Sequence, residues 1–248
     1  MVLLAGDLAA IEPRALAYLA KDKASLDAAR NTKDWYEARA RAWGLYDKPE
    51  PLKVGDSALR DRIKQLEIGL GYGMGPDTYQ KKTGLTAEKA FENHQNYRLW
   101  NPKVEDFWKL LRKGLYGSIG ADFSVTLPSG RKVKFRSIRK DEKSNNMSFL
   151  RLTPRGYVRK NVFAGFATEN LVQALARDIY MDRVLAVSRA GLRIVLRVHD
   201  EIVCEVPEDK AEESAKLLKQ IMETPPSWAP DLPLAAGVNW GRTYADAK

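Results

Sequence analysis

The stretch RIVLRVHDEIVCEV, residues 193–206, constrains the fold more than any other part of this chain. Apolar residues alternate on both sides of a polar centre, His199-Asp200-Glu201. The alternating residues are Ile194, Leu196, Val198, Ile202, Cys204 and Val206. Such a period predicts two strands, each with one buried face, joined by a tight turn. A histidine and two carboxylates are unusual there, since Asn-Gly or Asp-Gly is the common choice. The tip is either a solvated turn or part of a site for a hard cation such as magnesium.

Length, charge and cysteine content limit the classes of protein that fit. The 248 residues are enough for one large or two small domains with a substantial core. A net charge of +9 favours a polyanionic partner, nucleic acid first and an anionic membrane second. The single cysteine, Cys204, excludes an internal disulfide. Because we find neither a signal peptide nor a membrane span, we expect a cytoplasmic protein of a bacterial or phage-infected cell, without a membrane partner.

The N-terminal segment places another carboxylate at a strand end. A short apolar run, residues 2–5, leads to Asp7, and residues 11–21 are typical of a helix with Pro13 in its first turn. An aspartate between a strand and a helix can cap the helix. It can also lie at the edge of a sheet, where it would meet the carboxylates of the hairpin tip. The residues alone leave both interpretations open.

Residues 57–73 are typical of a helix that begins at Ser57 as N-cap and ends in a glycine-rich turn. Four of its residues are spaced by four and share one face: Arg60, Lys64, Ile68 and Tyr72. Two cations followed by an apolar and an aromatic residue suit a triphosphate followed by its sugar and base. A solvated basic face with an apolar edge is the alternative.

The remaining pattern predicts a mixed α and β protein. Helices are expected over residues 86–115, with a break at Asn101-Pro102, and over 168–189 and 208–222; the last segment predicts a loop and a closing strand. Residues 123–135 indicate a hairpin, and its tip and the following RSIRKDEK are rich in Lys and Arg. This basic segment can contact a phosphate backbone or form a solvated edge strand.

Together, a strand ending at Asp7, a helix with two cations and a tip with Asp200 supply the parts of a nucleotidyl-transfer site. Such sites use two divalent metals held by carboxylates from separate strands. At this point the chain resembles the family A DNA polymerases, the family of bacterial DNA polymerase I, and above all their phage and prophage members. GDLAAIEPRALAYL resembles motif A, RDRIKQLEIGLGYG motif B and VHDEIV motif C. TENLVQALARDI resembles a helix whose glutamine contacts template or primer, and DLPLAAGVNWG the usual ending.

This resemblance spans nearly all of the chain and implies an α+β fold, a right-hand palm with an antiparallel sheet and helical fingers. It assigns residues 1–22 to the palm with motif A and 23–120 to the fingers with the motif B helix 57–73. Residues 121–248 return to the palm with the motif C hairpin 193–206. Since motif A begins at residue 7, the thumb, the first palm segment and the 3′–5′ exonuclease domain are expected to be absent.

The resemblance also implies a role for each acidic residue at the palm. Asp7 and Asp200 are expected to hold two Mg²⁺ ions, with Mn²⁺ as an alternative, and the Leu8 backbone carbonyl to be a further ligand. Leu8 replaces the usual tyrosine of motif A, which is tolerable if only its carbonyl is needed. Glu201 is expected to support the metal site or the primer terminus, and His199 to lie near the primer end.

For the incoming dNTP, the resemblance implies a set of contacts from motifs A and B. Arg60 is expected to bind the outer phosphates, and Lys64 to contact the triphosphate and protonate the departing pyrophosphate as a general acid. Tyr72 is expected to stack near the templating position, and Glu12 to exclude a ribose 2′-hydroxyl as a steric gate. Ile68 stands where the family has an aromatic that packs on the sugar, which puts discrimination against dideoxynucleotides in doubt.

Two further residues complete the set of expected DNA contacts: Gln173 in the duplex minor groove, and Arg14, whose main expected role is to support the motif A loop. The implied activity is that of a DNA-directed DNA polymerase acting on primer–template DNA, as the catalytic half of a truncated or split enzyme with a companion chain for the thumb or exonuclease. The alternatives are a single-subunit RNA polymerase relative, and a DNA-binding accessory or inactive remnant. Glu12 and the His-Asp-Glu tip argue against the first, and the intact motif residues against the second.

Overall fold

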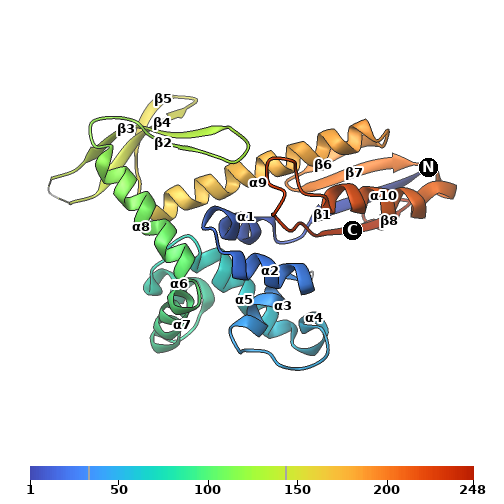
Figure 1. The fold of residues 1–248 in the computed structure, drawn as a ribbon, viewed down its shortest axis with the longest axis horizontal. Helices are drawn as coiled ribbons and strands as arrows, with labels where there is room; N and C mark the ends of the chain where they lie inside the picture. Colours follow the sequence, from blue (N-terminus) through green and yellow to red (C-terminus); the bar gives the residue numbers. More distant parts are fainter. Residues whose placement is uncertain (33, 143) are drawn as a thin grey trace.

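Two antiparallel sheets lie at opposite ends of one long helix, α9 (Ala164–Arg189), as Figure 1 shows. The computed structural model describes residues 1–32, 34–142 and 144–248. Helix α9 starts four residues earlier than expected, and its predicted core stripe is buried, with Leu171, Leu175 and Ile179 inaccessible to solvent. The prediction of an α+β fold with an antiparallel sheet is confirmed.

The first sheet contains the predicted hairpin. Its order is β6-β7-β1-β8, with β1 (Val2–Leu8), β6 (Arg193–Val198), β7 (Glu201–Val206) and β8 (Ala236–Gly241). The strand bounds 193–206 are confirmed, but the expectation of one buried face per strand is wrong. Leu196 is exposed because the register between β6 and β7 shifts after Ile194. Almost all of β7 is buried, since it is a central strand and Ala247 from the chain end packs on Val203.

Most of the other helices lie on one side of α9, below it in the view of Figure 1, and the last helix of the chain packs on β1 and β8. Their bounds are α1 (Ile11–Leu19), α2 (Lys23–Thr32), α3 (Trp35–Ala42), α4 (Leu52–Gly55), α5 (Ser57–Leu70), α6 (Pro76–Thr83), α7 (Ala87–Trp100), α8 (Pro102–Gly117) and α10 (Ala211–Glu223), with a 3₁₀ turn at Glu208–Lys210. The expected break at Asn101 is confirmed, since α7 ends and α8 begins there. Among the described residues, no helix is both long and apolar enough to cross a bilayer.

Helix α5 differs from its prediction at both ends. Asp56, not Ser57, is the N-cap, because its carboxylate accepts from the Leu59 backbone N–H at 2.8 Å. The helix ends at Leu70 rather than 73, and Gly73 follows with a φ of 72°, a conformation that suits glycine. Tyr72 therefore lies in the turn after the helix rather than on it.

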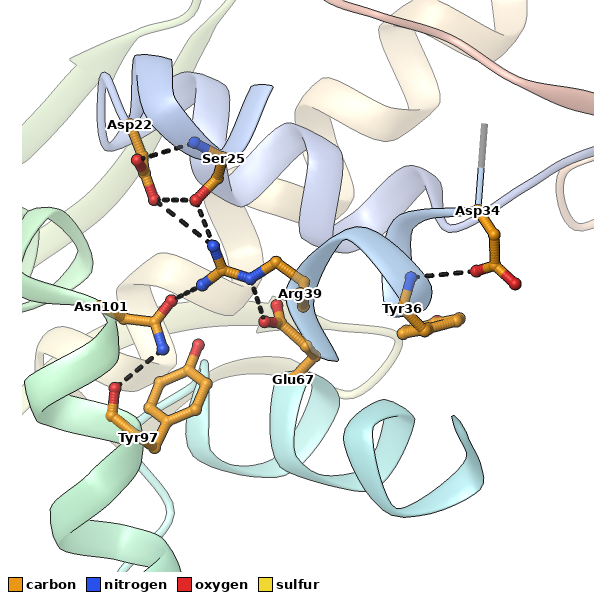
Figure 2. A network of polar contacts seen from close by, with 8 residues as sticks. All are labelled: Asp22, Ser25, Asp34, Tyr36, Arg39, Glu67, Tyr97 and Asn101. Carbon is orange, nitrogen blue, oxygen red and sulfur yellow. Dashed lines mark hydrogen bonds and ion pairs between the residues drawn. The ribbon is translucent and has the colours of Figure 1, made fainter. Parts of the chain in front are cut away.

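A buried ion-pair network fixes α5 against α3 (Figure 2). Arg39 of α3 is 4% exposed and its Nε donates to Glu67 of α5 at 2.9 Å. The same guanidinium donates to Ser25 and Asn101, and it lies 4.0 Å from the Asp22 carboxylate. A buried charge needs such partners, since desolvation otherwise penalises it strongly. The network thus sets where the exposed face of α5 points.

The second sheet, order β2-β3-β4-β5, was only partly predicted. Its strands are β2 (Phe123–Thr126), β3 (Lys132–Lys140), β4 (Met147–Thr153) and β5 (Gly156–Asn161). The expected hairpin 123–135 corresponds to β2 and β3, while β4 and β5 had no clear period. Of the basic segment RSIRKDEK, Lys143 lies outside the described residues. This sheet shares no strand with the first, and the palm and finger boundaries proposed above remain predictions.

Candidate active site

Antiparallel pairing places Asp7 beside the hairpin tip. In the register of β1 and β7, Asp7 lies directly opposite Glu201, and the Leu8 N–H donates to the Asp200 carbonyl at 3.4 Å. His199 begins the two-residue turn with a φ of 53°, a conformation that is uncommon for residues other than glycine. A pocket of about 360 Å³ opens here, lined in part by Asn239. We call this the carboxylate pocket.

The electrostatics of the carboxylate pocket disfavour three free negative charges. The pKa of Asp7 is raised from 3.8 to about 6, first by burial and then by the charge of Asp200, a hydrogen bond with Asp200 and the charge of Glu201; Lys248 opposes the shift. Like charges held this close favour a proton or a cation between them. The two aspartates, from β1 and from the turn, are therefore a place where positive charge stabilises the fold.

The Glu201 carboxylate is held by residues near the chain end. Its side chain is 7% exposed; the Tyr244 hydroxyl donates to its Oε1 at 2.5 Å, and the Lys248 ammonium lies 3.8 Å from its Oε2. Lys248 also donates to the Tyr244 hydroxyl at 3.0 Å. Tyr180 of α9 donates to the Glu201 backbone carbonyl at 2.9 Å. Sequence reasoning missed Tyr244 and Lys248, because nothing local to them indicates a contact with β7.

The donors in this pocket fit a hard divalent cation. Magnesium is commonly bound by one or two carboxylates together with waters and substrate phosphates, rather than by a complete protein cage. Within the described part of the chain, no group of three or more His, Cys, Asp or Glu residues forms such a cage. Asp7 and Asp200 supply the two carboxylates, and the raised pKa of Asp7 is the property that a bound cation would relieve.

The exposed face of α5 lines a second and larger hollow of about 960 Å³, which we call the α5 cleft. Five of the predicted site residues line it: Glu12, Lys64, Ile68, Tyr72 and Gln173. Lys64 and Ile68 are exposed on α5, and Gln173 is exposed on α9. Residues from α1, α5, the turn after α5 and α9, more than a hundred positions apart in the chain, therefore line one hollow.

Tyr72 and Glu12 form a direct contact across the α5 cleft. The Tyr72 hydroxyl donates to Glu12 Oε2 at 2.6 Å. Burial and this hydrogen bond raise the pKa of Tyr72 above its ordinary value, so the phenol stays protonated and remains a donor. The backbone of Gly165 in α9 packs so closely on the Tyr72 carbonyl that a Cβ there would lie 2.0 Å from the oxygen. The position of Tyr72 is thus fixed from both sides.

Three predicted residues, Arg60, Arg14 and Leu8, line neither of the two hollows. Arg60 pairs with Asp34 at 2.8 Å and packs over the Tyr36 ring. Arg14 is 1% exposed and donates to the backbone carbonyls of Ala9 and Pro233. Burial lowers the pKa of Arg14 to about 10.

The grouping of Arg14 with DNA contacts is therefore wrong, because its side chain is enclosed, whereas its bond to Ala9 agrees with support of the loop after β1. The Leu8 side chain is buried in the core.

Comparisons with known proteins agree with the motifs. A family model described as DNA polymerase family A matches residues 1–246. The DNA polymerase of Bacillus phage SP02 is 30% identical over 256 residues, which cover 93% of this chain and 39% of that protein. The thermostable DNA polymerase I of Thermus filiformis is 29% identical over 254 residues, which cover all of this chain and 27% of that protein.

A solved structure described as the POL domain of Pol1 from M. smegmatis, in complex with DNA primer-template and dNTP, matches all of this chain with a TM-score of 0.71 and 25% identity. The match covers 40% of that chain. The present chain thus spans about two-fifths or less of the length of these proteins.

Proposed function

Because this chain belongs to DNA polymerase family A, we propose that it is the catalytic part of a DNA-directed DNA polymerase. It would add deoxynucleotides to the 3′ end of a primer, with the sequence of a template strand as guide. The observation that carries this proposal is the approach of Asp7, at the end of β1, and Asp200, in the turn between β6 and β7. In the proposed reaction the primer 3′ oxygen attacks the α-phosphorus of the dNTP and pyrophosphate leaves.

In this proposal Asp7, Asp200 and the Leu8 carbonyl would hold two magnesium ions, or manganese in their place. The ions, when bound, lower the pKa of the attacking hydroxyl and neutralise the triphosphate. Glu201 contributes by position: Tyr244 and Lys248 hold its carboxylate in place beside the aspartate pair.

In this proposal the two cations of α5, Lys64 and Arg60, bind the phosphates of the dNTP. Lys64 is exposed in the α5 cleft, where it can contact the triphosphate and donate a proton to the departing pyrophosphate. Arg60 has to exchange Asp34 for the outer phosphates, since the two are paired at 2.8 Å. That exchange requires only a side-chain movement, because both residues are partly exposed.

Base and strand contacts are assigned to the other residues of the two hollows. Ile68 would pack on the sugar, Tyr72 would lie at the templating position and Gln173 would contact the minor groove of the duplex. His199, exposed at the tip beside Asp200, would lie near the primer end. The proposal includes both arrangements expected from the motifs, a part of a longer polymerase or a chain with a companion that supplies further duplex contacts.

Sugar selectivity gives a prediction at Glu12. Glu12→Ala should raise incorporation of ribonucleotides relative to deoxynucleotides by roughly ten- to a hundredfold, because it removes the group that crowds a 2′-hydroxyl. Tyr72→Phe is the matched control: it removes the 2.6 Å hydrogen bond to Glu12 but keeps both the carboxylate and the ring. The measurement is kcat/KM for dCTP against CTP on one primer–template. Unchanged sugar selectivity in Glu12→Ala would show that Glu12 is not the steric gate.

Primer extension tests the proposal as a whole. A labelled primer on a longer template, with Mg²⁺ and four dNTPs, should be extended to the template end, and EDTA should stop it. A single-subunit RNA polymerase relative would instead use NTPs in preference to dNTPs. An accessory protein would bind the primer–template and yield no longer product.

A further inference from the structure

Nearly all of the net charge of this chain comes from the second sheet. Residues 121–162 contain eleven Lys and Arg against three Asp and Glu, which gives +8 of the total +9. The ten cations among the described residues of this segment are all exposed. A concentration of one sign of charge on one small element is typical of a surface that binds a polyanion.

The strand register assigns many of these cations to one face. Arg136 of β3 lies opposite Leu150 of β4, and Leu150 lies opposite Arg159 of β5. Because directly opposed residues share a face, the three side chains form a row across the sheet. Lys134, two residues before Arg136, lies on the same face, and Arg139 joins it after the bulge, opposite Ser148. We call this the basic face; its cations are Lys132, Lys134, Arg136, Arg139 and Arg159.

The opposite face is packed against the helices around Phe135 and Phe149. Phe135 and Phe149 are buried, and their ring centroids are 5.4 Å apart. The ring centroids of Phe149 and Phe166 of α9 are 5.7 Å apart. Phe123 also stacks on Phe135 at 6.0 Å. An aromatic layer therefore fixes this part of the sheet on the helices, whereas the cations of the basic face are all exposed.

Within the described residues, no carboxylate pairs with the basic face. Arg131, at the edge, is paired with Asp178 at 2.9 Å, whereas Lys132, Lys134, Arg136, Arg139 and Arg159 form no ion pair with an acid of the described ranges. Arg159 instead donates to the Ser137 carbonyl at 2.9 Å and to the Ser137 hydroxyl at 3.0 Å, which holds it across the bulge. Burial and the nearby charge of Arg139 lower the pKa of Arg159. Cations held together against their own repulsion are stabilised by an anion.

An exposed aromatic side chain on the same face indicates which kind of polyanion the basic face binds. Tyr157 is 56% exposed and lies opposite Leu152, which is 67% exposed. Positive charge interleaved with exposed aromatic residues is the combination by which proteins hold single strands, whose bases are free to stack. A paired duplex offers phosphates but no free base face.

We propose that the basic face binds single-stranded DNA, the template strand on its way to or from the α5 cleft. The identification of the bound strand as the template rests on the proposed polymerase function. The binding of single-stranded DNA to the basic face does not rest on it. Phe163 and Gly73 line both the α5 cleft and a smaller cavity at the base of the second sheet. That cavity also contains Arg98, Arg112 and Asn146, so polar and basic groups continue from Tyr72 toward the sheet.

Charge reversal on the basic face tests this proposal. Lys134→Glu with Arg136→Glu changes two exposed cations, and Lys216→Glu with Lys219→Glu on α10 is a control of equal charge change at another exposed surface. Tyr157→Ala removes the aromatic alone. Fluorescence anisotropy with labelled oligo-dT, and with a blunt duplex of equal length, gives Kd over a range of salt concentrations. Thermal unfolding checks that each variant is folded.

We expect the basic-face reversal to raise the Kd for oligo-dT at least about tenfold and to reduce its salt slope by about 1.4, the value for two lost contacts to a single strand. The α10 reversal should stay within about threefold of wild type. Tyr157→Ala should raise the oligo-dT Kd roughly fivefold or more and leave the duplex Kd unchanged. Equal weakening by both reversals, or weakening confined to the duplex, overturns the proposal.

Primer extension on a template that ends one nucleotide past the primer separates this proposal from the polymerase assignment. The basic-face variants should retain wild-type extension there, and Asp200→Asn should retain wild-type binding of oligo-dT. If wild type binds oligo-dT through the basic face but does not extend primers, the polymerase assignment fails and the binding surface stands.

Discussion

Asp7→Asn is expected to lower the rate of primer extension at least about a thousandfold and, in the absence of divalent cations, to raise the melting temperature. The loss of activity follows because the proposed metal ligand is removed, and the metal would stabilise several kcal/mol of charge in the transition state. The gain in stability follows because Asp7 is partly buried beside Asp200 and Glu201. With screening by solvent, we expect about 1 kcal/mol, or roughly 2–4 °C.

The pH dependence of this gain has a defined sign. The pKa of Asp7 is raised from 3.8 to about 6, so the stability contributed by its protonated form is complete below 3.8 and is lost as the pH rises through 6. Asn carries no charge at either pH. Thermal unfolding in EDTA should therefore show a larger advantage of Asp7→Asn at pH 7 than at pH 5. The opposite trend would mean that the carboxylates do not repel one another in the folded state.

Removal of Arg39 is expected to have the largest effect on stability. Arg39→Met should cost about 3–5 kcal/mol, because it leaves Glu67 buried without its 2.9 Å partner and leaves Ser25 and Asn101 without a donor (Figure 2). The measurement is the free energy of unfolding from a urea titration monitored by circular dichroism. Since α5 also carries Lys64, the variant should lose activity with stability.

Two further variants separate the network from a general effect of losing an arginine. Arg62→Met changes an exposed residue of α5 and should stay within about 0.5 kcal/mol of wild type. Arg39→Met combined with Glu67→Leu should recover part of the loss, because the buried uncompensated charge is gone. If Arg39→Met costs no more than Arg62→Met, the network does not hold α5 in place.

Features with a local period were predictable from the sequence. The hairpin of β6 and β7, the core stripe of α9 and the break at Asn101 each follow from side chains a few positions apart. The errors are of the same local kind: Asp56 competes with Ser57 for the α5 cap, and the bulge after Ile194 turns Leu196 outward. A one-residue shift in strand register moves a side chain to the other face of the sheet, and the local sequence pattern does not predict such a shift.

The parts of the site that were missed depend on contacts between distant segments. Tyr244 reaches Glu201 over 43 positions, and Arg14 is enclosed by a loop more than two hundred residues away. Strands β4 and β5 lack a strict period because their sheet projects from the core, so both faces of its outer part are exposed. Such placements follow from tertiary packing, to which the local sequence gives no direct access.

The most direct test of the central assignment is the identity of the first nucleotide added to a primer. Four templates that differ only in the base opposite the incoming dNTP are each offered one dNTP at a time with Mg²⁺, and product is quantified after a single turnover. Wild type is predicted to add the complementary dNTP in each case, and Asp200→Asn to add none above background. Addition of the same nucleotide on all four templates, or equal addition by Asp200→Asn, would contradict a template-directed polymerase whose chemistry depends on Asp7 and Asp200.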